Sequence, residues 1–195
     1  MDVTVDQAAA MLGRMPAVLR GLLGGIGSEW AHGDYGPGTF SPFDVVGHLI
    51  SGERSNWLPR IRQIVEEGAS RPFTVFDRYE HFEQSRGNGM HQLLAEFSAC
   101  REESLEGLRG LNLREEDLLR RGLHPALGEV SLGQLLATWV VHDLNHLAQI
   151  TRGLAARYEE AVGPWRGYLG IYRGPVTPMD AQGQERRRAA RGEQA

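Results

Sequence analysis

Apolar residues recur every three or four positions along four segments of this chain, which is the spacing of a buried face on an amphipathic helix. The pattern predicts helices over residues 4–23, 41–67, 88–108 and 132–158. Strand-like alternation is nearly absent. Long helices joined by loops predict an all-α fold, an antiparallel four-helix bundle with a long connection between its second and third helices.

Helix-start signals support two of these segments. Ser41 offers a good N-cap, Pro42 follows at the first helical position, and Asp44 is an acid in the first turn. Ser131 and Gln134 have the spacing of a capping box. The second and fourth predicted helices therefore have well-defined beginnings.

Prolines and two longer segments interrupt the regular pattern. Pro16 and Pro59 lie inside predicted helices and are expected to kink them. Residues 71–87 form a long, partly helical connection of the kind that often carries function. We predict one bundle domain over residues 1–175, with a flexible tail rich in Arg, Gln and Gly over residues 176–195.

Composition excludes several classes of protein. The chain is 41% hydrophobic with a net charge of −4, which gives no basic face for nucleic acid. It has one cysteine, Cys100, so it can form neither an intrachain disulfide nor a four-cysteine zinc site. No apolar stretch is long enough to span a membrane, and no signal peptide is visible, so we expect a cytoplasmic protein.

Candidate metal chemistry begins with His142 and His146. Residues four apart on a helix share a face, so both imidazoles can reach one position. Such a pair suits zinc, nickel, cobalt or iron. The alternative is an ordinary helix face with two solvated or hydrogen-bonded core histidines.

A third ligand would have to come from elsewhere in the chain. His48 is the best placed, because it lies in an apolar run of the second predicted helix beside Gly47, which allows close helix approach. His124 is the second choice, and its other interpretation is turn chemistry with Pro125. His32 lies in a glycine-rich loop, whereas His81 and His91 look like surface residues.

Neighbours of the pair have possible supporting roles. The sequence His-Asp-x-x-His is close to the His-Glu-x-x-His motif of zinc proteases, but Asp143 is shorter than the glutamate that serves them as general base. We expect Asp143 to be an outer partner, bound to an arginine. Asn145 and Gln149 lie near the histidine face and could orient ligands, and Arg152 could hold a carboxylate. Cys100 is expected to be a buried structural thiol.

Three stretches of sequence together resemble the DinB-like superfamily, the DinB/YfiT-like metal-dependent enzymes. They are residues 41–50, 122–132 and 135–150, and with the helix spacing the resemblance covers about residues 1–160. The resemblance implies a four-helix bundle in which His48, His142 and His146 bind a divalent metal ion. It also implies possible reactions, because relatives include thiol-dependent S-transferases and a maleylpyruvate isomerase.

These observations predict a metal-dependent enzyme that activates a thiol or water against a small-molecule substrate, as a transferase or a hydrolase. Zinc and nickel fit three imidazoles equally well, and a low-molecular-weight thiol is a candidate co-substrate. The alternative is a non-catalytic bundle that binds a metal or small molecule. A homodimer is possible in either case, with Trp57, Trp165 and the Phe76 loop as candidate contacts.

Overall fold

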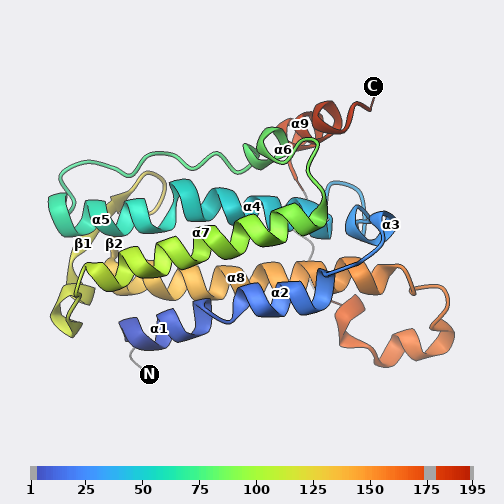
Figure 1. Ribbon diagram of the computed structural model, residues 1–195, viewed down its shortest axis with the longest axis horizontal. Helices are drawn as coiled ribbons and strands as arrows, with labels where there is room; N and C mark the ends of the chain where they lie inside the picture. Colours follow the sequence, from blue (N-terminus) through green and yellow to red (C-terminus); the bar gives the residue numbers. More distant parts are fainter. Residues whose placement is uncertain (1–3, 174–178, 194–195) are drawn as a thin grey trace.

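Four helical arms lie side by side along the long axis of the molecule in the computed structural model, which describes residues 4–173 and 179–193 (Figure 1). The first and second arms are each built from two helices, and the third and fourth from one. The arms are α1 (Val5–Leu12) with α2 (Met15–Leu23), α4 (Pro42–Ser55) with α5 (Trp57–Glu67), α7 (Met90–Gly110), and α8 (Leu132–Ala156). The predicted helical bundle is confirmed.

Shorter elements connect and cover the arms. They are α3 (Ser28–Ala31), α6 (His81–Gln84), η1 (Glu115–Leu119), β1 (Arg121–His124), β2 (Gly128–Ser131), η2 (Gly163–Tyr168), η3 (Gly170–Tyr172) and α9 (Ala181–Arg191). None of the helices in the described ranges is long and apolar enough to cross a membrane.

Local signals set the helix boundaries. The predicted N-cap at Ser41 and the predicted capping box at Ser131 are both formed, and each hydroxyl accepts a hydrogen bond from the backbone N–H three residues on. The kink expected at Pro16 is a break between α1 and α2. The second arm breaks at Asn56, because the ring of Pro59 conflicts with continuation of the preceding turn.

The core has two large apolar clusters, one toward each end of the bundle, and a small third cluster of Tyr79, Phe82 and Met179. Trp57 and Trp139 stack in one of them, with ring centroids 5.9 Å apart and planes within 9°. Trp57 is only 4% exposed. The suggestion that Trp57 contacts a second copy of the chain is therefore wrong, because its helix turns it into the core.

A short β-hairpin, which the sequence pattern did not reveal, covers one end of the bundle. Strands β1 and β2 are antiparallel, and β1 also holds the connection, because Phe73 N–H donates to the carbonyl of Leu123 over 2.8 Å. Gly122 packs so closely that an added Cβ would lie 2.6 Å from both Ile64 and Phe73. Strands of four residues are too short to show a readable alternation.

Helix α6, in the connection between α5 and α7, packs on α4. Gly47 does allow a close approach, and its partner is α6: an added Cβ would lie 2.5 Å from Ser85 Oγ. His81 is 1% exposed and packs against Phe40 and Phe82. The expectation that His81 lies on the surface is therefore wrong, because α6 folds down onto the bundle.

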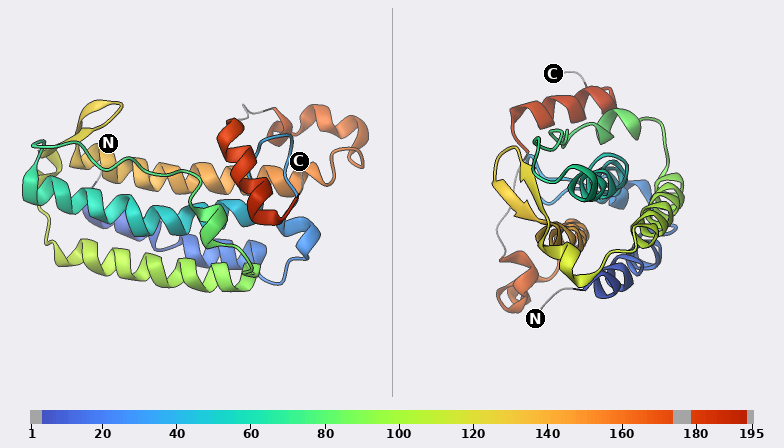
Figure 2. Two further views of the ribbon diagram at one scale, coloured as in Figure 1. Left: turned by 90° about the horizontal axis from the view of Figure 1, so that it is seen from above. Right: turned by 90° about the vertical axis from the view of Figure 1, so that its left-hand side faces the viewer.

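Within the segment predicted as a flexible tail, the structure has a helix, α9, that lies against α6 (Figure 2). Its arginines fasten it to acids in earlier parts of the chain. The pairs are Arg186 with Asp77, Arg187 with Asp34, and Arg191 with Asp44. Composition alone does not show that these charges find partners. Residues 176–178 and 194–195 of the predicted tail lie outside the described residues.

The segment after α8 is only partly packed. Tyr172 donates a hydrogen bond from its hydroxyl to the carbonyl of Ala155 over 3.0 Å. Trp165 and Tyr168 are 69% and 88% exposed. Both rings are therefore largely open to solvent.

Candidate metal centre

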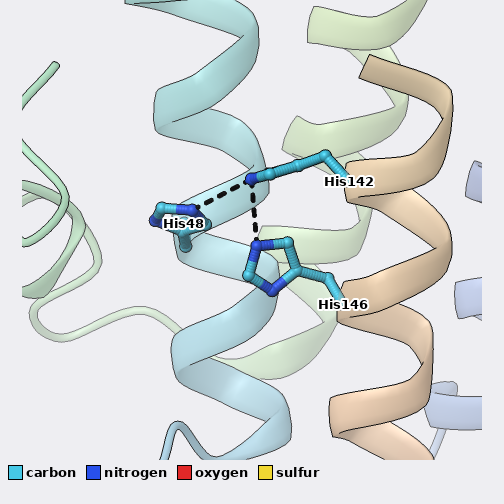
Figure 3. A group of neighbouring side chains, drawn as sticks. All are labelled: His48, His142 and His146. Carbon is cyan, nitrogen blue, oxygen red and sulfur yellow. Dashed lines mark hydrogen bonds between the residues drawn. The ribbon is translucent and has the colours of Figure 1, made fainter. Parts of the chain in front are cut away.

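Three imidazoles from two arms meet in the middle of the bundle (Figure 3). His48 comes from α4, and His142 and His146 lie one turn apart on α8. The Nε2 atom of His142 is 3.4 Å from that of His48 and 3.0 Å from that of His146. Sequence reasoning chose these three residues, and the structure brings their nitrogen atoms together.

The spacing of these nitrogens fits a single metal ion. A tetrahedral zinc site with Zn–N bonds of about 2.0–2.1 Å places neighbouring nitrogens roughly 3.3 Å apart. The two Nε2 distances in the cluster bracket that value. Among the described residues, this is the one group of at least three histidines, cysteines or acids close enough to hold a metal.

Outer hydrogen bonds orient two of the rings. Nδ1 of His48 lies 3.3 Å from the carbonyl oxygen of Arg78, and Nδ1 of His146 lies 2.7 Å from Oε1 of Gln149. An Nδ1–H that donates to oxygen leaves the Nε2 lone pair free for a metal. The structure therefore places Gln149 where the sequence analysis expected an orienting group.

Burial keeps the cluster uncharged. It lowers the pKa of His146 to about 4 and that of His142 to about 2, and repulsion from His146 further lowers the pKa of His142. Burial also holds the pKa of His48 well below its usual value, reinforced by the neighbouring imidazoles. Neutral imidazoles at pH 7 are the form that binds metals.

Asp143 belongs to a different part of the site. Its Oδ2 accepts a hydrogen bond from Nη1 of Arg101 over 2.7 Å, and both side chains are nearly inaccessible to solvent. Burial raises the pKa of Asp143 to about 6, against the pull of Arg101. The carboxylate is held by α7 and lies outside the histidine cluster. This placement speaks against the zinc-protease interpretation, in which the acid following the first histidine serves as general base.

Arg101 links all four arms. It also donates from Nη2 to Glu53 over 2.7 Å and from Nη1 to the carbonyl of Leu12 over 2.8 Å. Trp139 Nε1 donates to the same carboxylate of Glu53 over 3.1 Å. This buried network fixes α4 relative to α8, which are the two helices that carry the histidines.

The cluster opens onto a cavity of about 620 Å³. Its walls come from α4, α5, α8, the connection after α5 and the hairpin. Asn145, Gln149 and His124 line it together with the three clustered histidines. Arg152 is not among the lining residues. A cavity of this size matches sites that bind small molecules.

None of the remaining histidines belongs to the group that could hold the metal, although the ring centroids of His81 and His48 lie 5.5 Å apart. Nδ1 of His124 accepts hydrogen bonds from the backbone N–H groups of Ala126 and Leu127, both over 3.2 Å, so turn chemistry describes it best. His32 and His81 line a second cavity of about 380 Å³. His91 is exposed, as expected.

The arginines of the site were not predicted from the sequence. Arg101 lies one turn after Phe97 on the buried face of α7. A charged residue at a position where the pattern expects an apolar one could have indicated a buried ion pair. Arg60 likewise lies between buried residues of α5 and lines the cavity. Arg78 comes from the connection, where no periodic pattern indicates which residues face inward.

Cys100 lies on α7 and is half-buried. Burial raises the pKa of its thiol, which disfavours the reactive thiolate. The thiol is less buried than the sequence analysis expected, and its raised pKa gives no sign of a reactive cysteine.

A helical bundle with three converging histidines, two of them buried and one partly buried, and an adjoining cavity is suited to metal-dependent chemistry. The sequence profile of the DinB superfamily matches residues 11–150, and the chain belongs to this superfamily. No curated protein matches it in sequence.

A solved structure supports the fold. The chain is similar to YfiT from Bacillus subtilis, described as a probable metal-dependent hydrolase with an unusual four-helix bundle topology. The two share 20% sequence identity with a TM-score of 0.67, over 82% of this chain and 87% of that one. At this identity the likeness establishes the fold alone.

Proposed function

We propose that this protein is a metal-dependent hydrolase that binds one divalent ion through Nε2 of His48, His142 and His146. The observation that carries the proposal is the convergence of these three atoms, with neighbouring nitrogens 3.0 and 3.4 Å apart. Membership of the DinB superfamily and the description of YfiT support it. Zinc and nickel are two of the metals that imidazole ligands suit, and we propose one of them here.

Three neutral protein ligands leave coordination positions open, and a divalent ion held in this way lowers the pKa of a bound water or thiol toward 7. The chain's own residues supply the rest of the site. Gln149 and the Arg78 carbonyl fix two imidazole rings. The cavity wall next to the cluster includes the rings of Trp57 and Phe76, which limit access of bulk water to the reacting group.

A low-molecular-weight thiol is the second candidate nucleophile. A cavity of about 620 Å³ has room for a small thiol beside a small electrophile. In that case the protein would act as a thiol-dependent transferase. Offering each substrate with and without a thiol distinguishes a hydrolase from a thiol-dependent transferase, because only the transferase needs the thiol.

The test uses purified protein loaded with zinc or nickel and a panel of small esters and amides. We expect turnover by the loaded wild type and its loss in His142→Ala, which removes the ligand shared by both short Nε2 contacts. His91→Ala, an exposed histidine on α7, is the matched control and should keep full activity. Equal turnover by His142→Ala and wild type would refute the proposal. Metal binding without turnover would favour a non-catalytic binding bundle.

A further inference from the structure

Two arginines are buried among the described residues, and their surroundings differ sharply. Arg101 donates to the carboxylates of Glu53 and Asp143. Arg60, on α5, is 9% exposed and has no acid within ion-pair distance in the described part of the chain. Its Nη2 donates to the carbonyl of Thr74 over 3.1 Å, and its Nε is buried without a hydrogen-bond partner there.

Arg60 lines the cavity that adjoins the histidines. Its guanidinium lies over the ring of Phe73, 5.2 Å from the centroid. Burial lowers its pKa, yet a guanidinium remains charged at neutral pH. A buried charge is costly unless it is paired, so this group lacks the partner that burial normally requires.

The cavity wall offers no such partner. The described residues that line it include neither Asp nor Glu. They include a second cation, Arg78, whose charge further lowers the pKa of His142 and His146. Two guanidinium groups beside neutral imidazoles give the cavity a positive potential, which attracts anions.

The composition of the cavity wall indicates that the rest of the bound anion is apolar. Apolar and aromatic side chains make up much of the lining, including Trp57, Phe76 and Leu135. Arg60 lies on α5, beyond the break at Asn56, and His48 lies in the first half of α4, so the two residues are several helical turns apart along the second arm. An anion on Arg60 is therefore separated from the histidine cluster by an apolar stretch.

We propose that the cavity binds an elongated carboxylic acid. Arg60 pairs with its carboxylate, its apolar body lies along the aromatic wall, and its other end reaches the three histidines. A planar guanidinium matches a carboxylate in geometry and charge. The assignment of the reacting end rests on the proposed function, whereas the pairing with Arg60 does not.

The test compares two probes of equal size, 4-phenylbutanoate and its neutral amide, by calorimetric titration at pH 7.5. We expect wild-type protein to bind the acid at least about tenfold more tightly, because hydrogen bonds to charged groups are the stronger ones. Arg60→Gln should bring the two affinities within about twofold. Arg62→Gln, an exposed arginine on the same helix, is the matched control and should keep the preference.

Each outcome has a defined meaning. His142→Ala should keep the acid preference, because Arg60 and not the metal supplies it. A preference kept in Arg60→Gln would overturn the proposal, and so would a preference lost in His142→Ala, which would assign the carboxylate to the histidine cluster. Equal binding of acid and amide by wild type, or binding of neither below 10 mM, would also overturn it, and these results need no variant to fold. Metal content measured on the same samples tests the proposed function separately.

Discussion

Arg101 and Asp143 form an ion pair in the centre of the bundle, with Nη1 and Oδ2 2.7 Å apart and both side chains no more than 2% exposed. Asp143 is the residue next to His142, so this pair sets the position of α8 at the histidine cluster. Buried pairs are marginal as sources of stability, but removing one partner leaves an uncompensated charge.

Arg101→Met should therefore destabilise the protein severely. It leaves the carboxylates of Glu53 and Asp143 buried without their cation, and we expect a loss of about 3–5 kcal/mol in the free energy of unfolding. Urea denaturation followed by circular dichroism measures this. Arg114→Met is the control, because Arg114 and its partner Glu116 are 80% and 74% exposed and should contribute nothing measurable. Similar unfolding midpoints for the two variants would contradict the role assigned to Arg101.

Gln149→Leu should weaken metal binding without unfolding the protein. The variant removes the oxygen that lies 2.7 Å from Nδ1 of His146. Loss of such outer partners typically reduces metal affinity 10–100-fold. Competition with a chromogenic chelator measures the zinc affinity. Asn145→Leu changes a cavity-lining residue of the same helix with no hydrogen bond to the cluster and should keep wild-type affinity. Unchanged affinity in Gln149→Leu would show that the ring needs no such support.

Metal-free protein should lose stability as the pH falls from about 6.5 toward 4. In the unfolded chain each histidine takes up its proton near pH 6.5, whereas burial lowers the pKa of His146 to about 4 and that of His142 to about 2 in the folded state. The unfolded state then binds more protons than the folded state in this range, so the free energy of unfolding decreases as the pH is lowered. Asp143, with its pKa raised to about 6, acts in the opposite sense but is one group against three histidines.

Urea midpoints at pH 7.5, 6.0 and 5.0 in the presence of a chelator measure this dependence. The control is His91→Ala, which removes an exposed histidine and should leave the slope unchanged. A midpoint that stays constant or rises on acidification would mean that the cluster is not held neutral.

Gly183→Ala should loosen α9. A Cβ at this position would lie 2.5 Å from the ring of Tyr79, so the helix must shift away from the connection. We expect trypsin to cut within residues 186–191 several-fold faster, as followed by mass spectrometry. Gly21→Ala, inside α2 with open space around the added Cβ, should leave that rate unchanged. A wild-type cleavage rate in Gly183→Ala would show that the contact with Tyr79 is dispensable.

The helical arms could be predicted because each carries its own local signals. Capping residues such as Ser41 and Ser131, and prolines such as Pro16, act within a few residues of their own position. The three histidines could be selected for a related reason, since two share a helix face and the third interrupts an apolar run. Helix periodicity pairs His142 with His146, whereas the choice of His48 over His124 rested on its apolar surroundings and on the resemblance to the DinB-like superfamily.

The buried ion pairs, the packing of α9 and the burial of His81 depend on contacts between segments that are distant in the sequence, and helix periodicity does not indicate such contacts. The partners of Arg101 lie on three other arms of the bundle. The arginine-rich sequence of α9 is typical of a solvated tail, and its ion pairs with Asp34 and Asp44 depend on the fold of the rest of the chain. His81 looked exposed because nothing local shows that α6 folds back onto α4.

If His48, His142 and His146 hold one divalent metal ion, the metal content of the purified protein depends on all three. Tag-free wild type and the variants His48→Ala, His142→Ala, His146→Ala and the control His91→Ala are incubated with zinc or nickel, desalted and analysed for bound metal per chain. We expect about one ion in wild type and His91→Ala, and loss of the ion in each of the other three. A wild type that remains metal-free, or a variant of the cluster that keeps its ion, would contradict the account.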